Sequence, residues 1–264
     1  MTPIPATDIP SLSLLYKLGK LETSPLGTME DASPAHNGRV GLFRGDITTL
    51  QVDAIMNAAN SRLRGGGGVD GAIHRAAGPE LLRECIALDG CETGSCKITG
   101  AYNLPCKKVI HAVGPVYFNQ GPVEAEALLR GCYTSALQLA VDNDLKTVAF
   151  SAISTGVYGY PSIDAAVTAC SAVKSFLDRE DEDGKKLEKV IFVTFEEKDV
   201  RAYNTIIPRY FPPASNSADG EEDVTDEQVA EAEAKASQLP SVPQTEPSDS
   251  EHTLKKLKKH RQDE

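Results

Sequence analysis

Tryptophan is absent from the 264 residues, and aromatic residues account for only 6% of them. Long apolar runs are also missing, since no stretch approaches the roughly 18 apolar residues that cross a bilayer. The N-terminus has no basic segment followed by an apolar run of the kind that starts a secretory signal. We therefore expect an intracellular protein, cytoplasmic or nuclear, that does not associate with membranes.

The six cysteines form no CxxC pair, and no histidine stands near them at the spacing of a zinc finger. Disulfides are rare in the reducing interior of the cell, and a free cysteine packs as a small apolar residue. We therefore expect reduced thiols, no bound metal and no cofactor.

An excess of basic residues is missing too, because 38 acidic side chains outnumber 27 basic ones and give a net charge of −11. Direct binding to nucleic acid is not expected, because its phosphates attract a basic surface. Much of the excess acidity lies after residue 212, where aromatic residues end. We predict a folded domain over 38–212, a partly ordered N-terminal extension over 1–37, and a disordered acidic tail over 213–264 with a basic patch at its C-terminal end. No feature predicts an oligomer, so a monomer is the default expectation.

Strand and helix patterns alternate through the predicted domain. The strand segments are rich in apolar residues, and the helix segments repeat apolar residues at intervals of three and four. We predict strands over 40–44, 52–57, 101–104, 108–113, 147–153 and 190–195, and helices over 70–88, 123–143, 163–178 and 198–207. The alternation predicts an α/β fold with a mostly parallel sheet and helices on both faces. Ligands bind such sheets at the carboxyl ends of the strands.

Two glycine-containing loops follow predicted strands. Gly65–Gly68 precede a helix, and glycines there free the backbone φ and expose N–H groups to an anion or a ribose. Gly66, Gly68 and Gly71 fit the GxGxxG dinucleotide pattern, but that pattern is weak alone and here stands about seven residues too far from its strand. The second loop, Ser154–Pro161, also leads into a helix. Two such loops on one sheet edge are suited to hold a pyrophosphate from both sides.

Polar side chains stand beside these loops. Asn60 follows a strand, and Asp70 opens a helix, either as an ordinary first-turn carboxylate or as one that activates water beside a bound sugar and phosphate. The helix dipole is expected to lower the pKa of Asp70, which makes it a weak base and indicates help from a substrate phosphate. Asp46 has two interpretations, an N-cap or an acceptor for an exocyclic amine such as that of adenine. We interpret His74 as a structural residue outside the mechanism, and His111 either as a core residue or as one that supports the site from behind.

A long series of motifs runs in order over about 40–210. It comprises Gly45-Asp46-Ile47-Thr48, Asn57-Ala58-Ala59-Asn60, Gly65–Gly68 with Val69-Asp70-Gly71-Ala72-Ile73-His74, Gly90-Cys91-x-Thr93-Gly94, Val109-Ile110-His111-x-Val113-Gly114-Pro115 and Ile153–Pro161. The series resembles macrodomains of the MacroD type. The resemblance implies a three-layer α/β/α fold that binds ADP-ribose.

The resemblance also implies a role for each residue of the site. Asp46 bonds the adenine amino group, Ile47 lines the adenine pocket and Phe195 stacks on the adenine ring. The diphosphate and distal ribose are held by Gly66, Gly67, Gly68 and Val69 and by Ser154, Thr155, Gly156, Val157 and Tyr158. Asn60 fixes the hydroxyls of the distal ribose, and Asp70 positions water for attack at that ribose.

The function implied is that of a metal-independent hydrolase. It removes mono-ADP-ribose from acidic side chains of proteins and deacetylates O-acetyl-ADP-ribose, so its partners are ADP-ribose and mono-ADP-ribosylated proteins. Two alternatives stay open, a non-catalytic ADP-ribose reader and an ADP-ribose 1″-phosphate phosphatase. Readers commonly lack the pair Asn60 and Asp70, which favours the hydrolase. The chain departs from relatives at Ser61–Arg64, where they often have an apolar pair, and we expect Arg64 to point into water.

Overall fold

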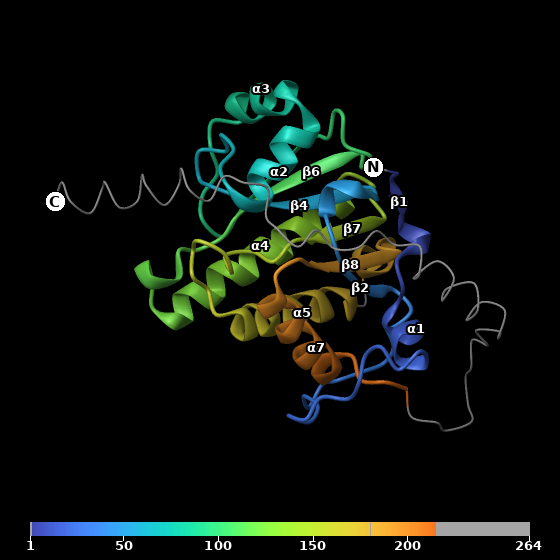
Figure 1. Ribbon diagram of the computed structural model, residues 1–264. Helices are drawn as coiled ribbons and strands as arrows, with labels where there is room; N and C mark the ends of the chain where they lie inside the picture. Colours follow the sequence, from blue (N-terminus) through green and yellow to red (C-terminus); the bar gives the residue numbers. More distant parts are fainter. Residues whose placement is uncertain (1, 180, 215–264) are drawn as a thin grey trace.

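The computed structural model describes residues 2–179 and 181–214. Its centre is a six-stranded sheet with the order β2-β8-β7-β4-β6-β5 (Figure 1). Every neighbouring pair is parallel except β5 and β6, which are antiparallel. The strands are β2 (Val40–Arg44), β4 (Ala54–Ala59), β5 (Cys96–Gly100), β6 (Lys108–Val113), β7 (Thr147–Phe150) and β8 (Lys189–Thr194), with a separate small pair of β1 (Ile4–Pro5) and β3 (Leu50–Gln51). The predicted mixed, mostly parallel sheet is confirmed.

Helices cover both faces of this sheet, as predicted. They are α1 (Leu12–Lys17), α2 (Gly68–Ala77), α3 (Pro79–Ala87), α4 (Pro122–Asp142), α5 (Ser162–Leu177), α6 (Glu182–Lys186) and α7 (Glu197–Tyr210). Figure 1 shows α2 and α3 on one side of the sheet and α4, α5 and α7 on the other. Two separate apolar cores result, one on each face. Strands buried on both faces read as continuous apolar runs, which explains why they stood out in the sequence.

Aromatic rings fill the centre of the larger core. Tyr133 of α4, Phe150 of β7, Phe192 of β8 and Tyr203 of α7 follow one another at centroid distances of 5.3, 6.4 and 5.2 Å. All four are almost fully buried. Tilted and edge-on contacts of this kind stabilise beyond the apolar area that they bury. These four aromatic residues therefore join the adjacent strands β7 and β8 to helices α4 and α7.

The prediction of one helix over 70–88 is wrong, because two helices form there. α2 ends at Ala77 and α3 begins at Pro79. Gly78 between them has a φ of 90°, in the region that favours glycine. Proline suits the first position of a helix because its missing N–H has no partner there. The helical periodicity continued across the break because both helices bury residues against the same face of the sheet.

The prediction of a strand over 101–104 is also wrong. The edge strand is β5, which ends at Gly100, and Tyr102 has a φ of 55° in the turn that follows. Leu104 N donates to Ala101 O at 3.1 Å within that turn. Ala101 and Leu104 are buried because the turn places them in the smaller apolar core. All other predicted boundaries lie within three residues of the observed ones.

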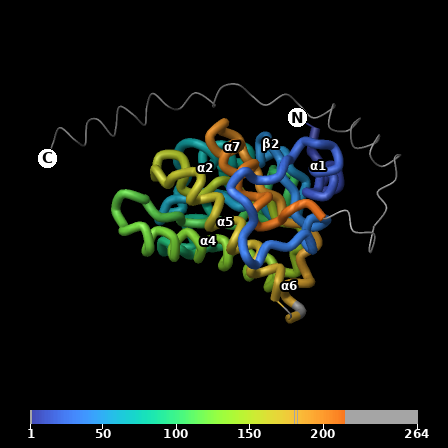
Figure 2. Tube along the Cα trace, turned by 90° about the horizontal axis from the view of Figure 1, so that it is seen from below, coloured from blue at the N-terminus to red at the C-terminus, as the bar shows by residue number. Residues whose placement is uncertain are grey.

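The segment before β2 packs against the end of α7. Tyr16 Oη donates to Phe211 O at 2.7 Å, and Asn37 Nδ2 donates to Pro212 O at 2.8 Å. Figure 2 shows this blue segment beside the orange end of α7. The two ends of the described chain therefore stabilise each other. The division of the chain at residues 38 and 212 stays a prediction.

The predicted acidic tail over 213–264 lies almost wholly outside the described residues, as does its basic patch. Within residues 2–179 and 181–214, no helix combines the length and the apolar character needed to cross a membrane. The longest, α4 with 21 residues, carries Glu124, Glu126 and Arg130.

Alkaline pH is expected to destabilise this fold. Burial raises the pKa of the Cys85, Cys106 and Cys132 thiols to about 12. An unfolded thiol ionises near pH 8.5, so above that pH the unfolded state binds fewer protons than the folded state. The free energy of unfolding should then fall by about 1.4 kcal/mol per pH unit for each thiol. Urea unfolding at pH 8 and pH 10 measures this loss.

A comparison with one thiol removed isolates the effect. Burial lowers the pKa of Lys189 to about 8, which opposes the thiols over the same pH range. The Cys132→Ala variant keeps this opposing contribution and loses one thiol, so its stability should fall less between pH 8 and pH 10 than that of the wild type. Equal losses in both proteins would contradict the prediction.

Candidate active site

The first part of the site is the loop between β4 and α2. Asn60, directly after β4, donates from Nδ2 to Gly65 O at 2.7 Å, and its Oδ1 accepts from Arg62 N at 3.1 Å. Leu63 is fully buried at a φ of 54°, so it anchors the middle of the loop in the core. Arg64 is exposed, as predicted. The amide of Asn60 therefore shapes the loop that leads to the glycines.

Glycine is required in this loop by its geometry. Gly65 and Gly68 have φ values of 74° and 58°. A side chain at Gly66 would start 3.2 Å from Asp70 Oδ2 and 3.6 Å from Asn60 Nδ2. The structure thus brings Asn60 and Asp70, predicted as the catalytic pair, to the backbone of one glycine.

Asp70 lies in the first turn of α2, whose N-cap is Gly67 and whose second residue is the half-buried Val69. Asn57 Nδ2 donates to Asp70 Oδ1 at 2.7 Å, and His74 Nε2 lies 3.5 Å from the same oxygen. Burial raises the pKa of Asp70, although the Asn57 hydrogen bond and His74 oppose the rise. The expected lowering of this pKa by the helix dipole is therefore wrong, because removal of the carboxylate from water outweighs its favourable contacts.

Asn57 and His111 lie beneath Asp70, and both are fully buried. They face each other in register on β4 and β6, and Asn57 Nδ2 lies 3.1 Å from His111 Nδ1. The other ring nitrogen, Nε2, lies 2.9 Å from Thr99 Oγ1 and 3.6 Å from Cys85 Sγ. No role was predicted for Asn57, yet a polar residue inside an apolar strand already requires a buried partner. The prediction that His111 lies in the core is confirmed.

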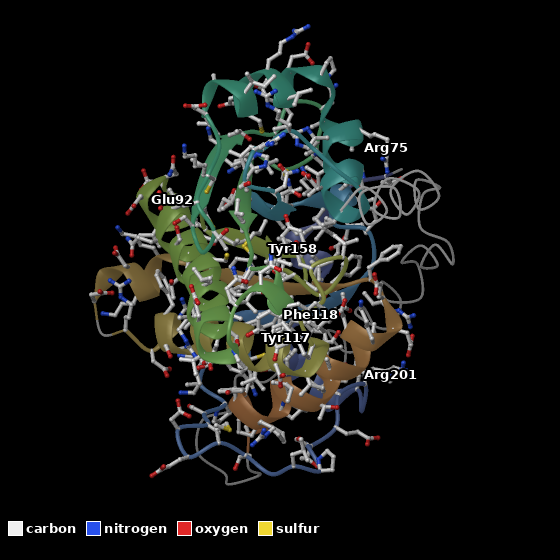
Figure 3. All side chains as sticks on the ribbon, turned by 90° about the vertical axis from the view of Figure 1, so that its left-hand side faces the viewer. Arg75, Glu92, Tyr117, Phe118, Tyr158 and Arg201 are labelled. Atoms are coloured by element: carbon white, nitrogen blue, oxygen red, sulfur yellow. The ribbon has the colours of Figure 1, made fainter. Side chains whose placement is uncertain are left out.

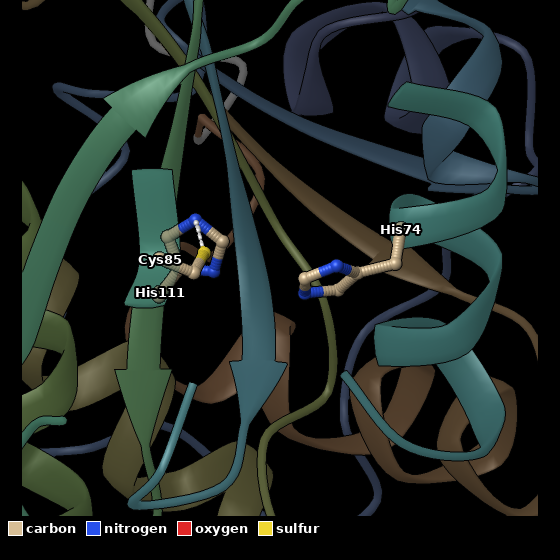
Figure 4. A group of neighbouring side chains, drawn as sticks. All are labelled: His74, Cys85 and His111. Atoms are coloured by element: carbon tan, nitrogen blue, oxygen red, sulfur yellow. Dashed lines mark hydrogen bonds between the residues drawn. The ribbon is translucent and has the colours of Figure 1, made fainter. Parts of the chain in front are cut away.

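The cluster also has the composition of a metal site. One ligand atom from each of His74, Cys85 and His111 lies within 4.8 Å of the others, and Figure 4 shows the His74 ring facing the Cys85–His111 pair from α2. A metal would need a free lone pair on His111, but Asn57 and Thr99 bond both of its ring nitrogens. Burial lowers the pKa of His111 to about 3 and raises that of Cys85 to about 12. The arrangement therefore favours neutral, hydrogen-bonded groups over metal ligands.

The second loop follows β7 and packs on the end of β6. Ser154 has a φ of 65°, and its buried hydroxyl has no hydrogen-bond partner among the described residues. A side chain at Gly114 would start 2.1 Å from that hydroxyl, so glycine permits the close packing. Thr155 Oγ1 donates to Asp199 Oδ2 at 3.1 Å, and Thr155 O accepts from Lys198 Nζ at 2.7 Å. These contacts fix the base of the loop against α7.

The tip of the second loop is more exposed. Gly159 N donates to Gly156 O at 3.0 Å in a tight turn, and Val157 is 85% exposed. Tyr158 is half-buried, and its pKa is raised by burial and by the negative charge of Asp70. Tyr158, at the tip of the second loop, therefore lies close enough to Asp70, in the first turn of α2, for the two side chains to interact electrostatically.

A third loop, Tyr117–Asn119, joins this face. Tyr117 N donates to Tyr158 O at 2.9 Å, and the Phe118 ring occupies the space where a side chain at Gly159 would start. Figure 3 shows Tyr158, Phe118 and Tyr117 together. No motif in the sequence indicated that this loop belongs to the site.

Asp46, Ile47 and Phe195 stand at the carboxyl ends of the neighbouring strands β2 and β8. Asp46 Oδ1 accepts from Thr48 N at 2.9 Å and from Thr48 Oγ1 at 2.8 Å, which caps the short turn Ile47–Thr49. Ile47 is buried and Phe195 is half-buried. The interpretation of Asp46 as an N-cap is confirmed, and its role as an acceptor for an amine stays a prediction.

The predicted residues form one band along the sheet edge. They follow β2, β8, β7 and β4, which are adjacent and parallel, so their carboxyl ends share that edge. Three strand spacings make the band about 14 Å wide. Asp46 and Phe195 lie at one end of it and Asp70 at the other, and the exposed residues of the two loops include Gly66–Gly68, Gly156 and Val157. The band therefore suits an elongated ligand with an anionic centre.

Comparison with known proteins gives matches over a part of the chain that includes Asn60, Asp70 and the second loop. A family model described as Macro domain matches residues 56–169. ADP-ribose glycohydrolase MACROD1 of Bos taurus is 50% identical over 178 residues, which cover 67% of this chain and 54% of that protein. ADP-ribose glycohydrolase MACROD2 of Xenopus laevis is 51% identical over 66% of this chain and 41% of that protein. The chain thus spans about half the length of these curated relatives.

This chain covers a larger share of one shorter relative and of one solved structure. A Macro domain-containing protein of Chlorobaculum tepidum is 52% identical over 63% of this chain and 94% of its own length. The crystal structure of the Trypanosoma brucei macrodomain in complex with ADP-ribose is 41% identical, with a TM-score of 0.60 over 75% of this chain and 86% of that one. The chain is thus 52% identical to the Chlorobaculum tepidum protein over nearly the whole length of that protein, and it shares its fold with the Trypanosoma brucei macrodomain. The chain belongs to the macro domain family.

Proposed function

We propose that the protein hydrolyses esters of ADP-ribose. Its substrates are proteins that carry mono-ADP-ribose on aspartate or glutamate, together with O-acetyl-ADP-ribose. The observation that carries the proposal is the convergence of Asn60 and Asp70 on the backbone of Gly66, with Asp70 buried and held by Asn57. Relatives about 50% identical that are named ADP-ribose glycohydrolases support it.

The ligand lies along the band with its adenine at the β2 end. Asp46 accepts from the adenine amino group, Ile47 lines the ring and Phe195 stacks on it. The diphosphate and distal ribose bind the backbone of Gly66–Val69 and the second loop, Ser154–Tyr158, where N–H groups and a helix start favour an anion. Asn60 fixes the ribose hydroxyls beside Asp70. The site needs neither a metal nor a cofactor for these contacts.

Asp70 acts on water next to the distal ribose. In an ADP-ribosylated protein, water adds to the anomeric carbon while Asp70 takes a proton from it, the bond from that carbon to the ester oxygen breaks, and the departing protein carboxylate recovers the proton. In O-acetyl-ADP-ribose, water adds to the carbonyl carbon of the acetyl group, the bond from that carbon to the ribose oxygen breaks, and ADP-ribose and acetic acid are released. Burial raises the pKa of Asp70, which brings a carboxylate base closer to neutral pH and makes its proton transfer more effective. Help from a substrate phosphate was expected because a lowered pKa would make Asp70 a weak base. Since burial raises this pKa instead, that reason for expecting help no longer holds.

Both substrate classes present the same group to this site. An ADP-ribosylated carboxylate and O-acetyl-ADP-ribose are both esters of the distal ribose, so one set of contacts to the nucleotide serves both. The enzyme is expected to cleave terminal units and to leave the links of a polymer intact.

Release of ADP-ribose from a protein mono-ADP-ribosylated on glutamate tests the proposal. The wild type should release free ADP-ribose and restore the unmodified protein. Absence of release, with ADP-ribose still binding in calorimetry, would identify a reader instead. Release of inorganic phosphate from ADP-ribose 1″-phosphate, without release from protein, would identify the phosphatase.

Replacement of Asp46 should weaken binding itself. Asp46→Ala removes a charged acceptor, and a hydrogen bond to such a group contributes about 1.5–3 kcal/mol, so the Kd for ADP-ribose should rise by about tenfold or more. Asp46→Asn keeps an oxygen that can cap Thr48 N and removes only the charge. Calorimetry should show weaker binding in both variants. Wild-type affinity in Asp46→Asn would mean that Asp46 acts only as a cap.

A further inference from the structure

We propose that His111 and Thr99 are positioning residues, which hold the Asp70 carboxylate in its reactive orientation through Asn57. The proposal rests on the hydrolase function and adds to it three buried groups that lie behind Asp70. The four residues come from α2, β4, β6 and β5 and are joined by successive hydrogen bonds. We refer to the set as the Asp70 relay.

The direction of each bond in the relay follows from the first. An ionised carboxylate only accepts hydrogen bonds, so the Asn57 atom 2.7 Å from Asp70 Oδ1 is the donor Nδ2. The same nitrogen lies 3.1 Å from His111 Nδ1 and donates its second hydrogen there. His111 Nδ1 therefore carries no proton, and the neutral ring carries its proton on Nε2.

Thr99 completes the relay and fixes this tautomer. His111 Nε2 donates to Thr99 Oγ1 at 2.9 Å, and Thr99 Oγ1 donates in turn to Gly100 O at 3.0 Å. Because the hydroxyl hydrogen is used on Gly100, Thr99 offers only a lone pair to the ring. A proton on Nε2 is satisfied there, whereas a proton on Nδ1 would meet the Asn57 amino group.

The orientation of the Asn57 side-chain amide carries an unfavourable free-energy contribution. Its Oδ1 is buried without a hydrogen-bond partner among the described residues. A buried acceptor without a partner is unfavourable, so the two bonds of Nδ2 must compensate for it. If His111 carried its proton on Nδ1, the amide would turn its oxygen toward the ring. The same oxygen would then face the Asp70 carboxylate and repel it.

The relay is a fixed support and not a switch. His111 and Asn57 are fully buried and Thr99 is 1% exposed, so water does not compete for these bonds. Burial also lowers the pKa of His111 to about 3, which keeps the ring neutral at any pH where the protein works. The tautomer that the relay needs is therefore present throughout that range.

Other ionisable groups face Asp70 from each element around it. His74 of α2 lies 3.5 Å from Oδ1, Tyr158 approaches from the second loop, and Cys85 of α3 lies behind His111. Of these groups, His74 favours the ionised form of Asp70, while burial disfavours it. The hydrogen bond from Asn57 is the larger of the two favourable contacts. Loss of the relay should therefore raise the pKa of Asp70 further.

Thr99 offers a matched pair of variants. Thr99→Val is nearly isosteric and removes the acceptor for His111 Nε2, whereas Thr99→Ser keeps the hydroxyl and removes only a methyl group. For Thr99→Val we expect kcat to fall about tenfold with KM unchanged, and the acid limb of the pH–rate profile to move to higher pH. Thr99→Ser should retain the wild-type kcat and pH profile. A purely structural role would lower thermal stability without moving the acid limb.

A measurement independent of turnover keeps the relay testable if hydrolysis is absent. Nitrogen-15 NMR of the histidine ring, assigned by its loss in His111→Gln, should find Nε2 protonated and Nδ1 bare in the wild type and in Thr99→Ser. Carbon-13 NMR of the Asp70 carboxyl should find that it titrates at higher pH in Thr99→Val. A proton on Nδ1 in the wild type, or the same Asp70 titration in all three proteins, would overturn the proposal. An active wild type with unchanged kcat and acid limb in Thr99→Val would overturn it as well, while an inactive wild type contradicts only the hydrolase function.

Discussion

Asp70→Ala is expected to lower the release of ADP-ribose by about 100-fold or more, because a positioned acid or base contributes 10²–10⁴-fold to a rate. The carboxylate is the buried group at the Asn60–Gly66 junction, and its raised pKa suits it to accept a proton from water. The affinity for ADP-ribose should stay within about tenfold, or about 1.4 kcal/mol, because the adenine and diphosphate contacts remain. Single-turnover release and calorimetry on the same preparation measure the two quantities.

A matched control separates this role from that of a helix-start carboxylate. Asp164 occupies the first turn of α5 but is exposed, and Asp164→Ala should leave turnover unchanged. Asp70→Asn, which keeps the shape and loses the charge, should be as inactive as Asp70→Ala. Equal losses of affinity in Asp70→Ala and Asp46→Ala would contradict the separation of catalysis from binding.

The acid side of the pH–rate profile follows from the same carboxylate. Asp70 has to be ionised to accept a proton, so activity is lost as the pH falls through its folded-state pKa. Burial raises that pKa above the usual range for aspartate, so the loss should begin at a higher pH than for an exposed carboxylate. The pH dependence of kcat/KM for the wild type measures this limb.

Gly71→Ala should have the second large effect, a loss of ADP-ribose binding of about tenfold or more together with lower thermal stability. Alanine normally stabilises the interior of a helix by about 1 kcal/mol relative to glycine. Here its Cβ would start 2.5 Å from the carbonyl oxygen of Gly66, which is backbone and cannot rotate away. The first loop must move off α2, and overpacking of this kind costs about 1–3 kcal/mol.

Gly38→Ala provides the control for this change. A side chain at Gly38 meets nothing within 4 Å, and its φ lies outside the left-handed region. Its affinity and melting temperature should match those of the wild type. If Gly71→Ala instead bound ADP-ribose normally and melted at a higher temperature, the close contact between α2 and the first loop would not be needed for binding.

Local sequence patterns predicted most of the sheet and its helices. Strands such as β6 and β8 are buried on both faces and therefore appear as continuous apolar runs. The break at Gly78 and the edge strand β5 were missed for different reasons. Helical periodicity does not register a change of direction when both helices bury residues on one face. An edge strand such as β5 is half-buried along much of its length and so lacks the continuous apolar signal.

The sequence by itself determined the parallel sheet, the two glycine-containing loops at its carboxyl edge and the pair Asn60 and Asp70, because each depends on residue types that are close in the chain. Tertiary structure alone decided the ionisation behaviour of Asp70 and the partners of Asn57. Desolvation depends on every atom that surrounds a group, and the partners Asn57 and His111 are 54 residues apart in the chain. They meet because β4 and β6 pair in a register that only the assembled sheet defines.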